Sequence, residues 1–141
     1  MIYLASDHAG FNMKKEIIKR LNSTKISYTD LGCNSIESVD YPNFANNLCQ
    51  KIKDGDIGII ICGTGIGVSI ASNRHNHIRC ALCHDNYTAK AARQHNNANV
   101  LALGARLSKY KDIEEIVEIW LKTPFEGGRH LKRINMIEIN E

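Results

Sequence analysis

Short apolar runs alternate along the chain with segments in which apolar residues recur every three or four positions. The runs "MIYLAS" (1–6), "ISYTDLG" (26–32), "IGIIIC" (57–62), "RCALCH" (79–84) and "NVLALG" (99–104) predict five β-strands. Helical spacing predicts helices over 11–21, over 40–56, after the glycines of 63–67, over 87–95 and over 113–121. This alternation indicates an α/β fold with a parallel sheet and helices on both faces. The tail from Glu126 onward is basic at first and helical in pattern at its end.

The composition of the 141 residues, with 43% hydrophobic and 23% charged, predicts one soluble domain over 1–141. The longest apolar run is far shorter than the roughly 20 residues that span a bilayer. The first residues show neither the basic nor the long apolar region of a secretion signal, so we expect a cytoplasmic protein with no membrane partner. The net charge of +3 favours an anionic small molecule over a nucleic acid as ligand.

The five cysteines form an odd set without the spacing of a small disulfide-rich domain, so we expect free thiols. The segment "CALCH" (80–84) matches the C-x-x-C-H pattern of covalent haem attachment. Strand alternation points Cys80 and Cys83 to opposite faces of the sheet, which favours a buried strand over a haem or zinc site. The histidines of "NRHNH" (73–77) lie in a polar stretch that is typical of a solvated loop.

The stretch "GTGIG" (63–67), followed about 20 residues later by Asp85, imitates a dinucleotide-binding fingerprint. The imitation is incomplete, because the spacing is G-x-G-x-G and the loop follows the third strand. Nucleotide binding therefore stays open as an alternative on these residues alone.

Ligands of an open parallel sheet bind beyond the carboxyl ends of the strands, where the strand order reverses. With the expected order 2-1-3-4-5, this point lies between the first strand, which ends at Asp7-His8, and the third, which ends at Cys62-Gly63-Thr64. Backbone amides of the glycine loop and the start of the next helix would face the crevice between them. A thiolate there could take a proton while the amides hold the resulting oxyanion. The alternative, an inert buried cysteine, stays open.

The helix over 87–95 must return to the amino edge of the sheet to start the fifth strand. His95 and Asn96 are therefore expected at the edge opposite to Cys62, and a second subunit would have to bring them to it. In the tail, Arg129 and Arg133 are four residues apart and share a helical face that could bind a phosphate group. The alternative is that this basic segment is only a solvated tail. Arg106 follows the fifth strand and is a further candidate anion contact.

In this order and spacing, "SDHAG", "DYP", "ICGTGIGVSIASN", "RQHNNANVLALGAR", "EGGRH" and the final "KR" resemble the ribose-5-phosphate isomerase B family, which includes the galactose-6-phosphate isomerase subunits. The resemblance covers nearly the whole chain. It implies a Rossmann-like three-layer sandwich and a homodimer or dimer of dimers with sites at the subunit interface. It also implies that neither a metal nor a nucleotide cofactor is needed.

The resemblance further implies catalytic roles. Cys62 resembles the base that moves a proton between C1 and C2 of the sugar, and Thr64 assists at the sugar oxygens. His95, with Asp7 opposite, resembles the group that helps to open the furanose ring. The loop amides that match an anion hole for the enediolate are those of Gly63, Gly65, Ile66 and Gly67.

Substrate contacts are implied in the same way. Tyr41 and Asn96 match sugar contacts. His8, Arg129 and Arg133 resemble phosphate contacts, with the arginines supplied by the neighbouring chain, and Arg106 is a weaker match for that role.

One branch of this family carries a glutamate base just after the glycine loop, where this chain has Val68, so the chain resembles the cysteine branch. The galactose-6-phosphate enzymes divide their catalytic residues between two different subunits, whereas here they occur in one sequence. We therefore expect an isomerase of ribose 5-phosphate and ribulose 5-phosphate. The alternatives are a six-carbon substrate such as allose 6-phosphate, or a non-catalytic module that binds a nucleotide or phosphate.

Overall fold

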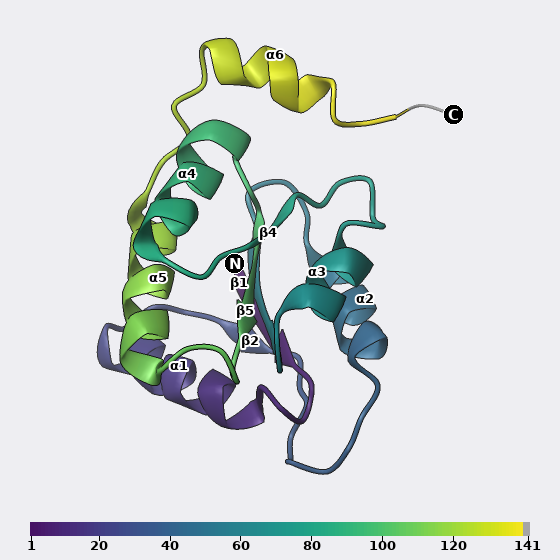
Figure 1. The fold of residues 1–141 in the computed structure, drawn as a ribbon, viewed down its shortest axis with the longest axis vertical. Helices are drawn as coiled ribbons and strands as arrows, with labels where there is room; N and C mark the ends of the chain where they lie inside the picture. Colours follow the sequence, from purple (N-terminus) through teal and green to yellow (C-terminus); the bar gives the residue numbers. More distant parts are fainter. Residues whose placement is uncertain (140–141) are drawn as a thin grey trace.

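A computed structural model of the protein describes residues 1–139, which form an α/β fold (Figure 1). The elements in chain order are β1 (Ile2–Ser6), α1 (Phe11–Ser23), β2 (Thr29–Asp30), α2 (Tyr41–Lys51), β3 (Ile57–Cys62), α3 (Ile66–Ser72), β4 (Cys80–Leu82), α4 (Asn86–Asn96), β5 (Val100–Gly104), α5 (Tyr110–Lys122) and α6 (Arg129–Asn135). A strand or helix occurs in each predicted segment. The second strand is shorter than its apolar pattern indicated, and the helix expected over 40–56 ends at Lys51. The helix of the tail is α6, which covers the basic part of the tail and not its end.

The strands form one parallel sheet in the order β2-β1-β3-β5-β4. The expected order 2-1-3-4-5 is therefore wrong for the last two strands. All five residues of β5 are buried, which suits its central place between β3 and β4, whereas the three residues of β4 are only partly buried and suit an edge. The adjacency of β1 and β3, on which the predicted crevice depends, is confirmed.

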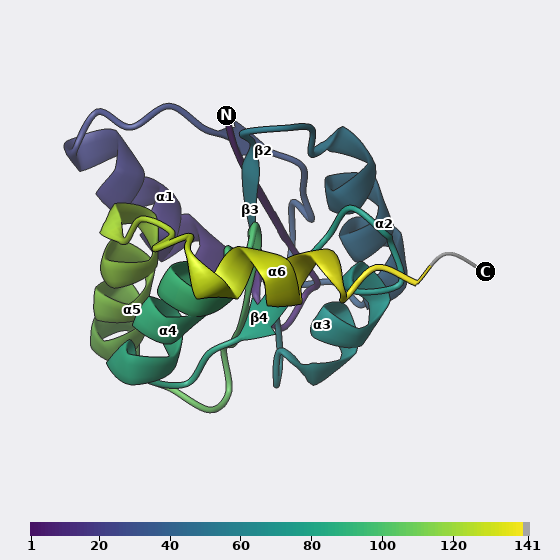
Figure 2. The ribbon, with the colours of Figure 1, turned by 90° about the horizontal axis from the view of Figure 1, so that it is seen from above.

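Helices cover both faces of the sheet, with α1, α4 and α5 on one face and α2 and α3 on the other (Figure 2). Successive residues of β3 contribute to different faces because strand side chains alternate. Ile59 and Ile61 pack in the core under α1, α4 and α5, while Ile60 and Cys62 pack in the core under α2 and α3. This alternation places the Cys62 thiol on the same side of the sheet as α3.

Helix α6 lies outside these layers, across the end of the molecule where α4 finishes (Figure 1). Because the chain enters β5 directly after α4, this is the end at which the parallel strands begin. The glycine loop lies at the other end, where β3 finishes. Among residues 1–139, no helix has the length and hydrophobicity needed to cross a membrane.

Candidate functional site

The carboxyl ends of β1 and β3 bring the first group of predicted site residues together. Ser6 pairs with Ile61 in the sheet, and the Asp7 N–H donates to the Ile61 carbonyl at 3.1 Å. Asp7 and His8 consequently leave β1 at the level where Cys62 and the glycine loop leave β3. The two strand ends between which a crevice was predicted therefore lie side by side.

Cys62 ends β3 and is only 5% exposed. The Gly65 N–H donates to its Sγ at 3.1 Å, which directs a positive dipole end at the sulfur, where a thiolate would carry its charge. Two other thiols are disfavoured as thiolates. Burial raises the pKa of Cys83 to about 11, and it also raises the pKa of Cys80. All five cysteines are free, as expected from their spacing.

The glycine loop after Cys62 carries backbone amides at the carboxyl end of the sheet. Gly65 has a φ of +78°, a left-handed conformation that favours glycine, and this turn reverses the chain into α3. The Ile66 N–H donates to the Thr64 hydroxyl at 3.2 Å. Within residues 1–139, the amides of Gly63 and Gly67 have no acceptor. These amides are available to an anion or to an oxyanion.

Two predicted side chains flank this loop. The Tyr41 ring, from the first turn of α2, lies so close to Gly67 that a Cβ there would overlap a ring carbon. The Arg106 guanidinium lies over Gly63, where a Cβ would meet its Nη1 at 2.8 Å, and the Arg106 N–H donates to the Gly63 carbonyl at 2.9 Å. Both residues can therefore contact a ligand held by the loop amides.

Asp7 and His8 are fixed by bonds to the backbone. The Asp7 carboxylate accepts from the Gly10 N–H at 3.0 Å, and Asp7 is 8% exposed. The Val39 N–H donates to His8 Nδ1 at 3.1 Å, so Nδ1 is the acceptor and Nε2 carries the hydrogen of the neutral ring. His8 can therefore donate through Nε2 to an anion without being protonated on both nitrogens.

Lys14, which the sequence did not single out, anchors the loop beside β1. Its side chain is fully buried, and its Nζ lies 2.6 Å from the Asp30 carboxylate and 2.7 Å from the Cys33 carbonyl. The same loop bonds to both backbone groups of Ser6, from the Ser6 N–H to the Gly32 carbonyl and from the Cys33 N–H to the Ser6 carbonyl. This ion pair thus holds the residue that precedes Asp7.

The remaining predicted residues lie at the opposite end of the sheet. His95 and Asn96 end α4, and Arg129 and Arg133 lie on exposed positions of α6, beside the end of α4 (Figure 1). The predicted edge for His95 and Asn96 is confirmed. Within one chain, the structure therefore does not bring these four residues together with Cys62.

Sequence reasoning missed two neighbours of His95. Its Nε2 lies 3.8 Å from the Glu126 carboxylate, and the His130 ring stacks on the His95 ring at 4.6 Å between centroids. Both residues belong to the segment "EGGRH", but only a tertiary contact between α4 and the tail reveals their proximity to His95.

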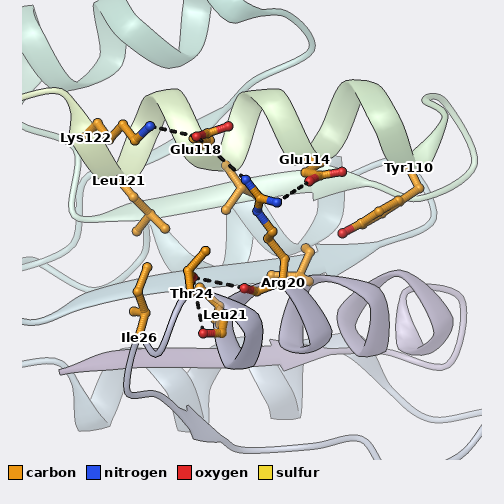
Figure 3. A pocket seen from close by; sticks show the side chains of 11 residues that line it. Arg20, Leu21, Thr24, Ile26, Tyr110, Glu114, Glu118, Leu121 and Lys122 are labelled. Atoms are coloured by element: carbon orange, nitrogen blue, oxygen red, sulfur yellow. Dashed lines mark hydrogen bonds and ion pairs between the residues drawn. The ribbon is translucent and has the colours of Figure 1, made fainter.

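An apolar cavity of about 200 Å³ lies between α1 and α5, with the Arg20 guanidinium and its partners Glu114 and Glu118 at its rim (Figure 3). None of the predicted site residues lines this cavity. It occupies the face of the sheet opposite to Cys62.

Comparison with known proteins identifies the family of the chain. Residues 2–137 match the family model described as Ribose/Galactose Isomerase, and the chain belongs to this family of isomerases. A putative sugar phosphate isomerase of Bacillus subtilis is 46% identical over 139 residues, which cover 96% of this chain and 93% of that protein.

Solved structures show the same fold. A ribose 5-phosphate isomerase from Thermotoga maritima has a TM-score of 0.94 and 47% identity, covering 97% of this chain and 96% of that one. A ribose-5-phosphate isomerase B from Mycoplasma genitalium, solved with bound ribulose-5-phosphate, has a TM-score of 0.93 and 44% identity, with coverage of 96% and 92%. The Rossmann-like sandwich expected from the sequence is confirmed.

Proposed function

We propose that this protein interconverts D-ribose 5-phosphate and D-ribulose 5-phosphate in the cytoplasm through an enediolate, with Cys62 as the base. The observation that carries the proposal is the Cys62 sulfur at the mouth of the glycine loop, with the Gly65 N–H at 3.1 Å. The similarity to the Mycoplasma genitalium enzyme with bound ribulose-5-phosphate supports a five-carbon substrate.

The proton transfer follows from the chemistry of the loop. The Cys62 thiolate takes the proton from C2 of the open-chain aldose and returns it to C1, and the ketose forms. Between the two transfers, negative charge lies on the oxygens of C1 and C2, where the free amides of Gly63 and Gly67 stabilise it, joined by those of Gly65 and Ile66 as these leave Cys62 and Thr64. The Thr64 hydroxyl lies beside these oxygens and relays their protons.

The complete site in this proposal needs two copies of the chain. One copy supplies Cys62, Asp7, His8, Tyr41 and the loop, and the partner supplies the residues of its opposite end. His95 of the second copy then opens the furanose ring together with Asp7, and Asn96 contacts the sugar. The phosphate group is held by His8, Arg106, Arg129 and Arg133. The support is the separation of these residues to opposite ends of one chain.

Replacement of the base tests the mechanism. Cys62→Ala should abolish turnover and the exchange of solvent deuterium into C2, while thermal unfolding stays cooperative. Cys80→Ala, which removes another thiol from the same face of the sheet, is the matched control and should retain native turnover. Turnover by Cys62→Ala would refute the role of the thiol. The native enzyme should keep its activity in EDTA, because the mechanism uses no metal.

Subunit mixing tests the shared site. Cys62→Ala and His95→Asn are each expected to be inactive, but in a mixed dimer one of the two sites receives both native residues. Random association of equal amounts should restore about a quarter of native activity. Full activity in an isolated monomer of the native protein would contradict the shared site.

A further inference from the structure

Three side chains form a cluster at the end of the molecule that carries α6. His95 ends α4, and Glu126 and His130 belong to the tail segment that folds back over it. One carboxylate faces both rings: the distance from His95 Nε2 to Glu126 Oε1 is 3.8 Å, and that from His130 Nε2 to Glu126 Oε2 is 3.9 Å. All three potential ligand atoms lie within 4.8 Å of one another.

These two imidazoles differ from most of the other histidines because neither of their ring nitrogens is hydrogen-bonded within residues 1–139. His8, His75 and His77 each have a ring nitrogen hydrogen-bonded to Val39, Asn46 and Cys49, respectively. Within residues 1–139, the rings of His95 and His130 have only the long contacts to Glu126 and their mutual stacking. Their lone pairs are therefore available to a ligand between them.

We propose that His95, Glu126 and His130 form a binding site for a divalent transition metal ion, with Zn²⁺ as the preferred ion. Two imidazole nitrogens and one carboxylate oxygen are a donor set that zinc uses in proteins, with a fourth position left for water. Zinc bonds of 2.0–2.2 Å in tetrahedral geometry place ligand atoms about 3.4 Å apart. The cluster must therefore contract by no more than about 1.4 Å from its present span of 4.8 Å.

The exposure of the side chains permits this contraction. The side chains of His95 and Glu126 are 42% and 48% exposed, so they can turn, whereas His130 is 11% exposed and forms the fixed side of the site. The near-parallel rings, with 21° between their planes, must tilt so that both Nε2 lone pairs converge on the ion. Rotation of the half-exposed His95 ring supplies this tilt.

Occupancy of this site has a consequence that rests on the proposed function. A metal bound to Nε2 of His95 blocks the nitrogen that is to exchange protons with the sugar ring oxygen. Zinc is therefore an inhibitor of the isomerase and not its cofactor, and EDTA reverses the inhibition.

Cobalt binding tests the site without reference to catalysis. Co²⁺ in a tetrahedral nitrogen and oxygen site gives visible absorption, which Zn²⁺ abolishes when it displaces cobalt. Loss of an outer-shell partner alone costs metal sites 10–100-fold in affinity, so Glu126→Gln and His130→Gln should each weaken Co²⁺ binding by at least about tenfold. Glu126 is half exposed, so this variant reports on the site even if His130→Gln fails to fold.

Two controls separate this cluster from other metal ligands. His75→Gln removes an imidazole from the other pair of neighbouring histidines, and Cys62→Ala removes the thiol of the glycine loop. Both should bind Co²⁺ with native affinity. Native binding by Glu126→Gln, or loss of binding in Cys62→Ala, would overturn the proposed site. Tight binding at the cluster without inhibition of turnover would instead contradict the role of His95 in the proposed function.

Discussion

Gly104 offers a sharp test of how closely the catalytic loop must be positioned. It ends β5, pairs with Cys62 in the sheet, and lies against the backbone of Thr64. A Cβ at this position would lie 2.6 Å from the Thr64 carbonyl oxygen and 2.7 Å from the carbonyl carbon. Normal contact between such atoms begins near 3.4 Å. Gly104→Ala must therefore displace the loop by about 0.8 Å, because backbone cannot rotate out of the way as a side chain can.

The expected result is a large loss of rate with a moderate loss of stability. A misplacement of about 1 Å can lower turnover about 100-fold, so kcat for ribose 5-phosphate should fall by about that factor. Overpacking of this kind typically costs about 1–3 kcal/mol in the free energy of unfolding. The kcat comes from a coupled assay at saturating substrate, and the free energy comes from urea denaturation of the same preparation.

A matched variant separates the two effects. Val117→Ala removes two methyl groups from the core on the other face of the sheet and should cost about 2–3 kcal/mol in the free energy of unfolding. It should leave kcat unchanged. If folded Gly104→Ala retains kcat within twofold of the native value, the loop is not positioned by this contact and the reasoning fails.

Three further predictions concern stability and binding. Lys14→Met should destabilise the fold by about 2–3 kcal/mol in urea denaturation, less than the 3–5 typical of a fully buried broken pair because the side chain of Asp30 is 33% exposed. Burial raises the pKa of Cys83 from about 9 to about 11, so the stabilising effect of its neutral thiol is complete below pH 9 and is lost as the pH rises towards 11. Cys83→Ala should reduce this pH dependence in thermal unfolding curves, and the remainder comes from Cys49 and Cys80, whose pKa values burial also raises; an unchanged slope would assign the whole dependence to those groups. Arg133→Ala should mainly raise KM, because a contact remote from the reacting carbons contributes mostly binding energy; an equal fall in kcat with unchanged KM would count against a phosphate contact.

Hydrophobic patterning predicted the strands and helices well because the apolar pattern of a segment reflects how that segment is buried. The run "IGIIIC" is apolar at nearly every position, which only a strand covered on both faces requires, and β3 is that strand. The second strand was predicted over 26–32 but covers only Thr29–Asp30, since it pairs with β1 alone at the edge of the sheet. The expected order of β4 and β5 was wrong because strands that follow one another in the sequence need not be neighbours in a sheet, and the fully buried "VLALG" takes the central position.

The candidate site was predictable to the extent that strand direction determines it. Asp7 and Cys62 were placed at one edge and His95 at the other because a helix between parallel strands must return to the edge where strands begin. The support of Asp7 by Lys14 and the contact of His95 with His130 were not predictable. Both depend on side chains that meet across elements distant in sequence, and no local pattern reports such contacts.

The side chains of β3 alternate between the two faces of the sheet, and this alternation limits which mutations the protein can tolerate. Removing a single residue between Ile57 and Ile61 would invert the parity of the strand, turning the sulfur towards α1 and α5 and Ile61 towards α2 and α3. Substitutions that exchange one aliphatic residue for another leave this parity intact. Mutational libraries that vary the identity of β3 residues should therefore retain active members, whereas single-codon deletions in the same strand should yield none.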